Sequence, residues 1–352
     1  MKSNLFKVSI AGILLISFIN PVTAAANNKW DPLPSVEESR INGGEFSGAY
    51  RTGPAGAINW YFANIGLSAF VDRIPGEVKQ YMNVYISNLS PSFTVSNIEF
   101  SDPYEPETSA WAKTRQDSDD AYAATFLSLA YRYYQATGDR AWLNANLKTL
   151  KNIAEYDLVR IQNANGLVRT YQNASWSDAY YTEDNCEDYK GLKDLSSLLA
   201  SINDPDAARY NKAAAKIAKA IKDLMYLPSE KGWSAAWNGA VDPISYSATE
   251  IFYPGAVTQI FPEVNSVPLP VQMYAAGWNK LNSMAPGWEN GQYDAHAWAI
   301  LGYAAALHND PTKAQAQQRR IRTMVADPLT RGSVGINDLG YYSETNKRLT
   351  GR

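Results

Sequence analysis

The chain has 352 residues, and its 32 Lys and Arg residues nearly balance 35 Asp and Glu residues, which leaves a formal net charge of −3. This balance disfavours nucleic-acid binding, which usually needs a basic patch. Aromatic residues make up 12% of the chain, whereas it holds only 2 histidines. The composition therefore favours stacking surfaces over a histidine metal site.

The first 26 residues resemble a secretory signal. Lys2 and Lys7 supply the positive start, residues 8–19 form an apolar core, and small residues at 22–26 offer a cleavage site. The apolar core is too short for a membrane span, and no later stretch reaches the roughly 20 apolar residues that a span needs. We expect an exported protein, secreted or periplasmic in a bacterium, with no membrane anchor after cleavage.

Cys186 is the only cysteine, so no intramolecular disulfide can form, and a structural zinc site is practically excluded. The acids Asp117, Asp119 and Asp120 lie close together but lack the spaced oxygen ligands and the turn glycine of a calcium loop. We predict no metal site and no cofactor.

Helical patterns dominate the chain after an arm at residues 27–56, which is rich in Gly, Pro, Ser and Asn and is predicted to be irregular. Strand-like alternation is almost absent. Residues 57–352 are predicted to form a single domain. Its expected helices cover 57–72, 77–89, 119–136, 140–158, 184–201, 207–226, 247–260, 271–284, 293–308 and 313–326, and a turn-rich tail follows from residue 327.

The connections between these helices alternate in kind. Each odd helix is followed by a short turn of Gly, Asp and Pro residues, such as Thr137-Gly138-Asp139, whereas long or aromatic loops lead into the third, fifth, seventh and ninth helices. Pro75, Gly138 and Pro205 mark a quasi-repeat of helical hairpins. Odd helices are more apolar and even helices more charged, which indicates an inner and an outer ring. The predicted fold is an all-α, α/α toroid of five to six helical hairpins.

In such a toroid the inner helices run the same way, so their N-termini and the loops before them share one face. Carboxylates gather at these starts: Asp117, Asp119 and Asp120 at the start of the third helix, and Asp184 and Glu187 in the fifth. Cleavage of a glycosidic bond needs two carboxyl groups, one protonated and one ionised. We expect Asp119 or Asp120 to supply one, and Asp184 or Glu187 the other.

Each acid also has a purely structural interpretation. Asp117, Asp120 and Asp184 are suited to capping their helices, and Asp188 is expected to face solvent. Glu289 and Asp294 could be loop or cap residues. His296 is more often a core histidine than a base. The further residues predicted to contact substrate are Trp111, Arg115, Asp117, Trp176, Tyr180, Tyr181, Asn185, Trp237, Trp288, Glu289 and Asp294.

Two stretches resemble the six-hairpin glycosidases, a superfamily of α/α toroids. Residues 117–127 (DSDDAYAATFL) with 134–139 (YQATGD) are similar to one of its inner–outer hairpins, and residues 184–192 (DNCEDYKGL) to the start of another. The resemblance implies an exported glycoside hydrolase that cuts a polysaccharide, with inversion as the expected course. Five hairpins are clear in the sequence, so the toroid is either incomplete or completed by the arm and the tail.

Two alternatives remain open from the sequence. A polysaccharide lyase would use Tyr180, Tyr181 or His296 as the base, with Arg115 or Asn185 neutralising a uronic acid. A carbohydrate-binding toroid without activity would bind oligosaccharides and turn none over. In every case the expected partner is a polysaccharide or oligosaccharide.

Overall fold

The computed structural model describes residues 30–177, 179–237 and 252–351. The expected signal at 1–26 and the start of the helix expected at 247–260 lie outside these ranges. The chain divides into two compact units, Met1–Asp31 and Pro32–Arg352, and every described helix and strand belongs to the second. Across the described residues, no helix combines the length and apolarity needed to cross a membrane.

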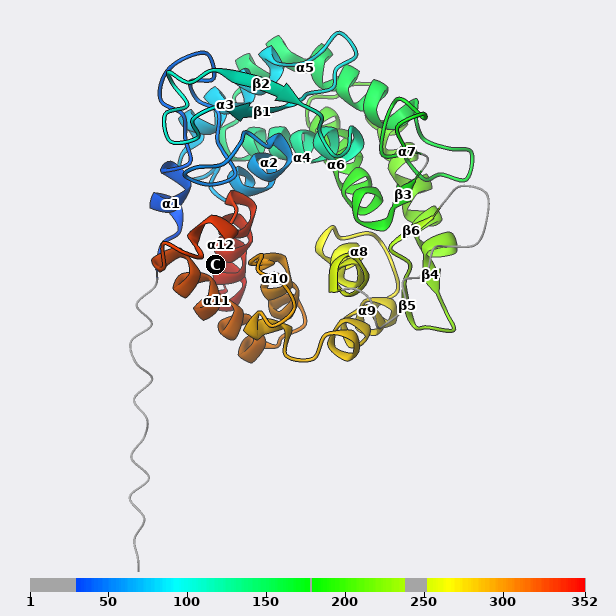
Figure 1. Cartoon of the computed structure of the whole chain (residues 1–352). Helices are drawn as coiled ribbons and strands as arrows, with labels where there is room; N and C mark the ends of the chain where they lie inside the picture. The colour runs from blue at the N-terminus through cyan, green and yellow to red at the C-terminus, as the bar shows by residue number, and fades with distance from the viewer. Residues whose placement is uncertain (1–29, 178, 238–251, 352) are drawn as a thin grey trace, which may run out of the picture. The chain divides into compact units, whose positions relative to one another are not determined.

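Two rings of helices build this second unit (Figure 1). Each inner helix packs on the next, and the last packs on the first. The inner ring consists of α2 (Trp60–Ser68), α4 (Asp120–Thr137), α6 (Thr182–Ser201), α8 (Phe261–Val264), α10 (Ala299–Leu307) and α12 (Ile336–Thr350). The outer ring consists of α1 (Leu33–Glu37), α3 (Pro75–Ser87), α5 (Arg140–Ala154), α7 (Ala207–Ala220), α9 (Val271–Met284) and α11 (Pro311–Ala326).

Short strands are confined to the connections. β1 (Asn97–Phe100) pairs antiparallel with β2 (Trp111–Thr114) in the long loop before α4. β3 (Tyr180–Tyr181) pairs with β6 (Ala236–Trp237), and β4 (Tyr226–Leu227) with β5 (Gly232–Trp233). These pairs fasten the loops that lead into the inner helices.

Local chemistry explains the hairpin turn between α4 and α5. Gly138 adopts φ 65°, a left-handed conformation that ends α4. Asp139 follows at once and caps α5, since its carboxylate accepts a hydrogen bond from the Trp142 backbone amide at 2.9 Å. The tight turn predicted at 137–139 is confirmed.

The tail and the arm complete the ring. The tail carries α12, which packs on both α2 and α10, and the arm carries α1, which packs on α12. The prediction of an irregular arm is therefore wrong for Leu33–Glu37, which is helical. The toroid has six hairpins, because chain segments from opposite ends of this unit form the sixth.

Three inner helices are shorter than predicted, and the first of them, expected at 57–72, is α2 at Trp60–Ser68. The helix expected at 293–308 begins at Ala299, because Trp298 takes a left-handed conformation with φ 51°. In place of the described part of the helix expected at 247–260, Phe252–Ala256 forms a π-type turn around a non-helical Tyr253, and Val257–Ile260 forms a 3₁₀ turn before α8. Pro254 and Pro262 lack the amide hydrogen that a continuous helix needs.

Ring closure depends on a close approach between α2 and α12. A Cβ atom on Gly340 would lie 2.8 Å from the Gly66 Cα atom. We therefore expect Gly340→Ala to lower the free energy of unfolding by roughly 1–3 kcal/mol, since the two helices must move apart. Chemical denaturation measures this loss.

Gly76→Ala is the matched control, because nothing lies within 4 Å of a Cβ atom there. Its unfolding midpoint should stay the same or rise. Equal stability of the Gly340→Ala variant and the wild type would show that the α2–α12 contact tolerates a wider spacing.

Candidate functional site

The inner helices begin around two adjoining cavities of about 380 Å³ and about 320 Å³. Both are lined by Tyr61, Asp117, Glu183 and Tyr253, so we treat them as one cleft. The remaining lining comes from the starts of α4, α6, α10 and α12 and the loops beside them, and it includes Ser118, Tyr181, Asp184, His296, Trp298, Asn337, Asp338 and Tyr341. The predicted convergence of helix N-termini is thus what forms the cleft.

Glu183 is the most distinctive acid of the cleft. It lies in the first turn of α6 with 9% of its surface exposed, and the Thr258 hydroxyl donates a hydrogen bond to its Oε1 atom at 2.8 Å. Burial raises its pKa to about 7, although hydrogen bonds from Thr258 and Tyr253 act in the opposite direction. Sequence reasoning missed Glu183, even though it precedes the predicted Asp184 directly.

Asp184 and Asp117 are the other acids that open onto the larger cavity. Asp184 is half-buried, and its pKa is raised by burial and then by the negative charges of Glu183 and Asp117. Asp117 is exposed and lines both cavities. The structure therefore brings these predicted residues together with Glu183.

The neighbouring Asp119 and Asp120 do not line the cleft. Asp119 is 4% exposed, and its carboxylate accepts hydrogen bonds from the Gln116 side chain and, at 2.9 Å, from the Gln172 backbone amide. Asp120 is fully buried and accepts from the backbone amide of Ala121 at 2.8 Å. Both carboxyls hold the start of α4 and the loop beside it.

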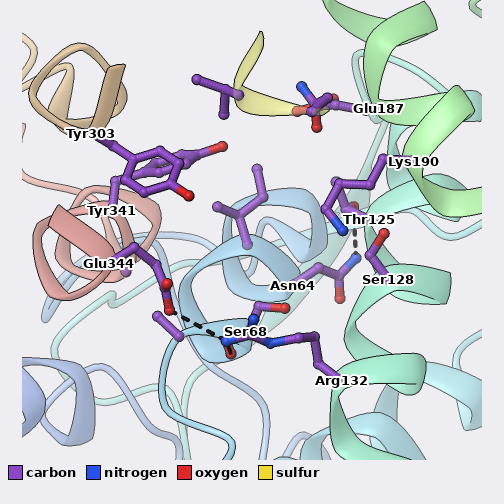
Figure 2. Close-up of a pocket in the computed structure, with 15 residues that line it drawn as sticks. Asn64, Ser68, Thr125, Ser128, Arg132, Glu187, Lys190, Tyr303, Tyr341 and Glu344 are labelled. Carbon is purple, nitrogen blue, oxygen red and sulfur yellow. Dashed lines mark hydrogen bonds and ion pairs between the residues drawn. The ribbon is translucent and has the colours of Figure 1, made fainter. Parts of the chain in front are cut away.

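Glu187 lies deeper in α6, against a separate cavity of about 150 Å³ (Figure 2). It is 4% exposed, and the Tyr61 hydroxyl donates to its Oε1 atom at 2.8 Å. Tyr61 itself lines the cleft, so this hydrogen bond connects the cleft wall to the deeper cavity. Burial first, and then the charge of Asp184, raises the pKa of Glu187.

The expectation that Asp188 faces solvent is wrong. Its side chain is fully buried, and its pKa is raised by burial and then by the charges of Asp184 and Glu187. The reason is that α6 packs on both α4 and α7, so little of this part of the helix reaches water. Cys186, on the same helix, is also buried.

The predicted aromatic contacts divide between cleft and scaffold. Tyr181 lines the larger cavity and is 37% exposed. Trp176 and Trp111 are 47% and 39% exposed but line neither cavity. Arg115 is also outside the lining, with its guanidinium 5.3 Å from the Trp176 ring centre.

Other predicted contacts serve the scaffold. Tyr180 is buried and packs edge-on against Trp237. Asn185 is fully buried, and its amide group bonds the backbone of Val168 and of Tyr181. These contacts hold the loop segments around Val168 and Tyr181 in place. They also occupy the amide group of Asn185, which is therefore not available to a ligand.

The residues expected near the ninth helix lie mostly outside the cleft. Trp288 is 1% exposed, with its indole N–H 3.3 Å from Asn282, and Glu289 pairs with Lys313 at 3.0 Å. Asp294 accepts the indole N–H of Trp298 at 3.0 Å. Asp294 therefore positions the indole ring of Trp298. Trp298 lines the cleft and was not predicted from the sequence.

His296 and Asp338 face each other in the smaller cavity, with 3.4 Å between the His296 Nε2 and Asp338 Oδ2 atoms. Asp338 also accepts the backbone amides of Ala299 and Gly335, each at 2.9 Å. It thereby ties the starts of α10 and α12 together. Among the described residues, no three His, Cys, Asp or Glu side chains are grouped so that they could hold a metal ion.

Comparison with known proteins gives matches in structure alone. No protein-family profile and no curated protein sequence matches the chain. A rhamnosidase from Klebsiella oxytoca is similar with a TM-score of 0.60 and 16% identity, over 86% of this chain and 60% of its own. The GH63 mannosylglycerate hydrolase from Thermus thermophilus is similar with a TM-score of 0.60 and 10% identity. The match covers 92% of this chain and 99% of the hydrolase.

A metal-independent alpha mannosidase from Streptococcus pneumoniae is also similar, with a TM-score of 0.57 and 13% identity, over 86% of this chain and 88% of its own. These identities are low, so the likeness concerns the arrangement of the helices. It agrees with the six hairpins described above. The chain therefore has an α/α-toroid fold, and these glycosidases are similar to it in that fold.

Proposed function

We propose that this protein is an exported glycoside hydrolase that cleaves a bacterial extracellular or periplasmic polysaccharide. The observation that carries the proposal is the cleft, in which Glu183, with its pKa of about 7, and the exposed Asp117 line the same two cavities. A protonated and an ionised carboxyl group are what hydrolysis of a glycosidic bond requires. The similar solved structures include a rhamnosidase, a mannosylglycerate hydrolase and an alpha mannosidase, which supports the same class.

The roles of the acids follow from their surroundings. Glu183 donates its proton to the glycosidic oxygen as the bond from this oxygen to the anomeric carbon breaks. Asp117 takes a proton from the water that attacks the anomeric carbon. Asp184 follows Glu183 directly as a further carboxyl group, and the charge of Glu183 adds to burial in raising the pKa of Asp184. Inversion is part of the proposal and comes from the superfamily resemblance.

A lyase acting on a uronic acid polymer is less well supported. Such an enzyme must neutralise the uronate carboxylate before it removes the neighbouring proton. No Lys or Arg belongs to the described lining of either cavity. Arg115 and Asn185, which the lyase alternative assigned to this task, are outside that lining.

A panel of polysaccharides with mass-resolved products tests the proposed activity. We expect new reducing ends, products heavier by one water per cut, and the inverted anomer in the initial NMR spectrum. Unsaturated products that absorb in the ultraviolet would identify a lyase, and binding without turnover on every polymer would identify an inactive toroid. N-terminal sequencing of the exported protein tests cleavage near residues 24–26.

Glu183→Gln should lower kcat by about 10²- to 10⁴-fold, because glutamine cannot donate the proton. Asp117→Asn should lower kcat over a similar range, since the amide cannot accept the proton of the water. Glu155→Gln is the control, because Glu155 pairs with Arg160 and Arg209 away from the cleft. Full activity in the Glu183 variant would remove it from the mechanism.

The pH profile offers a separate test of Glu183. A general acid works in its protonated form, so kcat/KM should fall as the pH rises through about 7. In Thr258→Val the carboxylate loses a donor that stabilises its charged form, so its pKa rises and this fall should move to higher pH.

Thr345→Val is the matched control for this shift. Thr345 is also a buried threonine, but its hydroxyl donates to the Tyr341 carbonyl oxygen. Its profile should match the wild type. If kcat/KM of Thr258→Val falls at the same pH as in the wild type, another group donates the proton.

A further inference from the structure

The described lining of the cleft contains more acidic than basic side chains. Its described lining includes the acids Asp117, Glu183, Asp184 and Asp338, and the only basic side chain among the described lining residues is His296. His296 already faces Asp338 across 3.4 Å. The carboxyl groups of the larger cavity therefore have no positive partner in the lining described.

Two arginines, Arg320 and Arg115, are held by other groups. The guanidinium of Arg320 donates to the backbone oxygens of His296 and Ala297, each at 3.1 Å, and of Asp294 at 3.2 Å. The guanidinium of Arg115 lies over the rings of Tyr171 and Trp176, at 5.2 Å and 5.3 Å from their centres. Both cations serve the walls behind the cleft.

Asp184 is an acid of the cleft that has no positively charged partner among the described residues. Its carboxyl group lines the larger cavity, and across the described chain it makes no hydrogen bond or ion pair. The charges of Glu183 and Asp117 raise its pKa further than burial alone. A positive charge in the cavity would relieve this repulsion.

The same cavity offers aromatic surface. Tyr253 is 47% exposed and packs on Trp298, with 4.7 Å between ring centres. Ring faces attract ammonium groups and also support the apolar face of a sugar ring. An ammonium group on a sugar ring would therefore meet both carboxyl groups and ring faces in this cavity.

We propose that the cleft selects a polysaccharide segment that carries free amino groups, with an ammonium beside Asp184 and its sugar ring against Tyr253. This inference rests on the proposed function and names the substrate class of the same site. A uronate in this position would meet three carboxyl groups and, in the described lining, no compensating cation.

Binding to the full-length mature protein tests this assignment. The probes are a glucosamine hexamer, the same hexamer fully N-acetylated, and an oligogalacturonate, measured by calorimetry near pH 6, where the amines are protonated. The free amine form should bind about tenfold more tightly than the acetylated form, and this preference should shrink as salt rises to about 0.15 M. The uronate should bind most weakly.

Asp184→Asn should abolish the preference for the free amine. Asp194→Asn is the control on the same helix, because Asp194 pairs with Lys190, and it should keep the full preference. Equal binding of both hexamers, or tighter binding of the uronate, would overturn the assignment, as would absence of binding by the amine form.

The outcome separates this inference from the proposed function. If neutral polysaccharides are cleaved and the amine form has no advantage, the hydrolase proposal stands and the substrate class is wrong. If the amine form binds preferentially and no polymer of the panel is cleaved, the charge selection is correct and the activity is wrong.

Discussion

The close packing of apolar inner helices is the constraint on which the whole structure depends. Each inner helix packs against two inner neighbours, and α4, α6, α10 and α12 also pack against an outer helix, so much of their surface is buried. A close approach joins α2 and α12, where Gly66 and Gly340 let two backbones meet. That contact connects the two ends of the helical unit and closes the ring.

Ring closure also decides where chemistry can occur. Because the inner helices run in one direction, their first turns surround the cleft, and side chains far apart in sequence meet there. Tyr61 from α2, Glu183 from α6 and Asn337 from α12 line the same space. Nearby hydrogen bonds, such as that from Ala299 to Asp338, hold the helix starts in register.

Burial of carboxyl groups is the electrostatic consequence of this packing. Asp119, Asp120, Glu187 and Asp188 all lie beneath or beside the cleft with little exposure, and burial raises the pKa of each. Desolvation disfavours the charged form, so burial in this ring of inner helices favours the protonated form of these carboxyl groups. This environment suits proton donation to a glycosidic oxygen.

The sequence by itself determined the all-α class, the alternation of inner and outer helices and the face on which acids gather, because these depend on local periodicity and turn chemistry. It also identified Asp117 and Asp184, which line the cleft. Only the tertiary structure decided that Glu183 opens into the cleft while Glu187 lies below it and Asp119 is bonded to Gln172. Those outcomes depend on the rotation of each helix about its axis and on partners such as Thr258, which are distant in sequence. The sequence likewise left open whether the arm and the tail supply a sixth hairpin, since the amphipathic pattern of α12 has meaning only against α2 and α10.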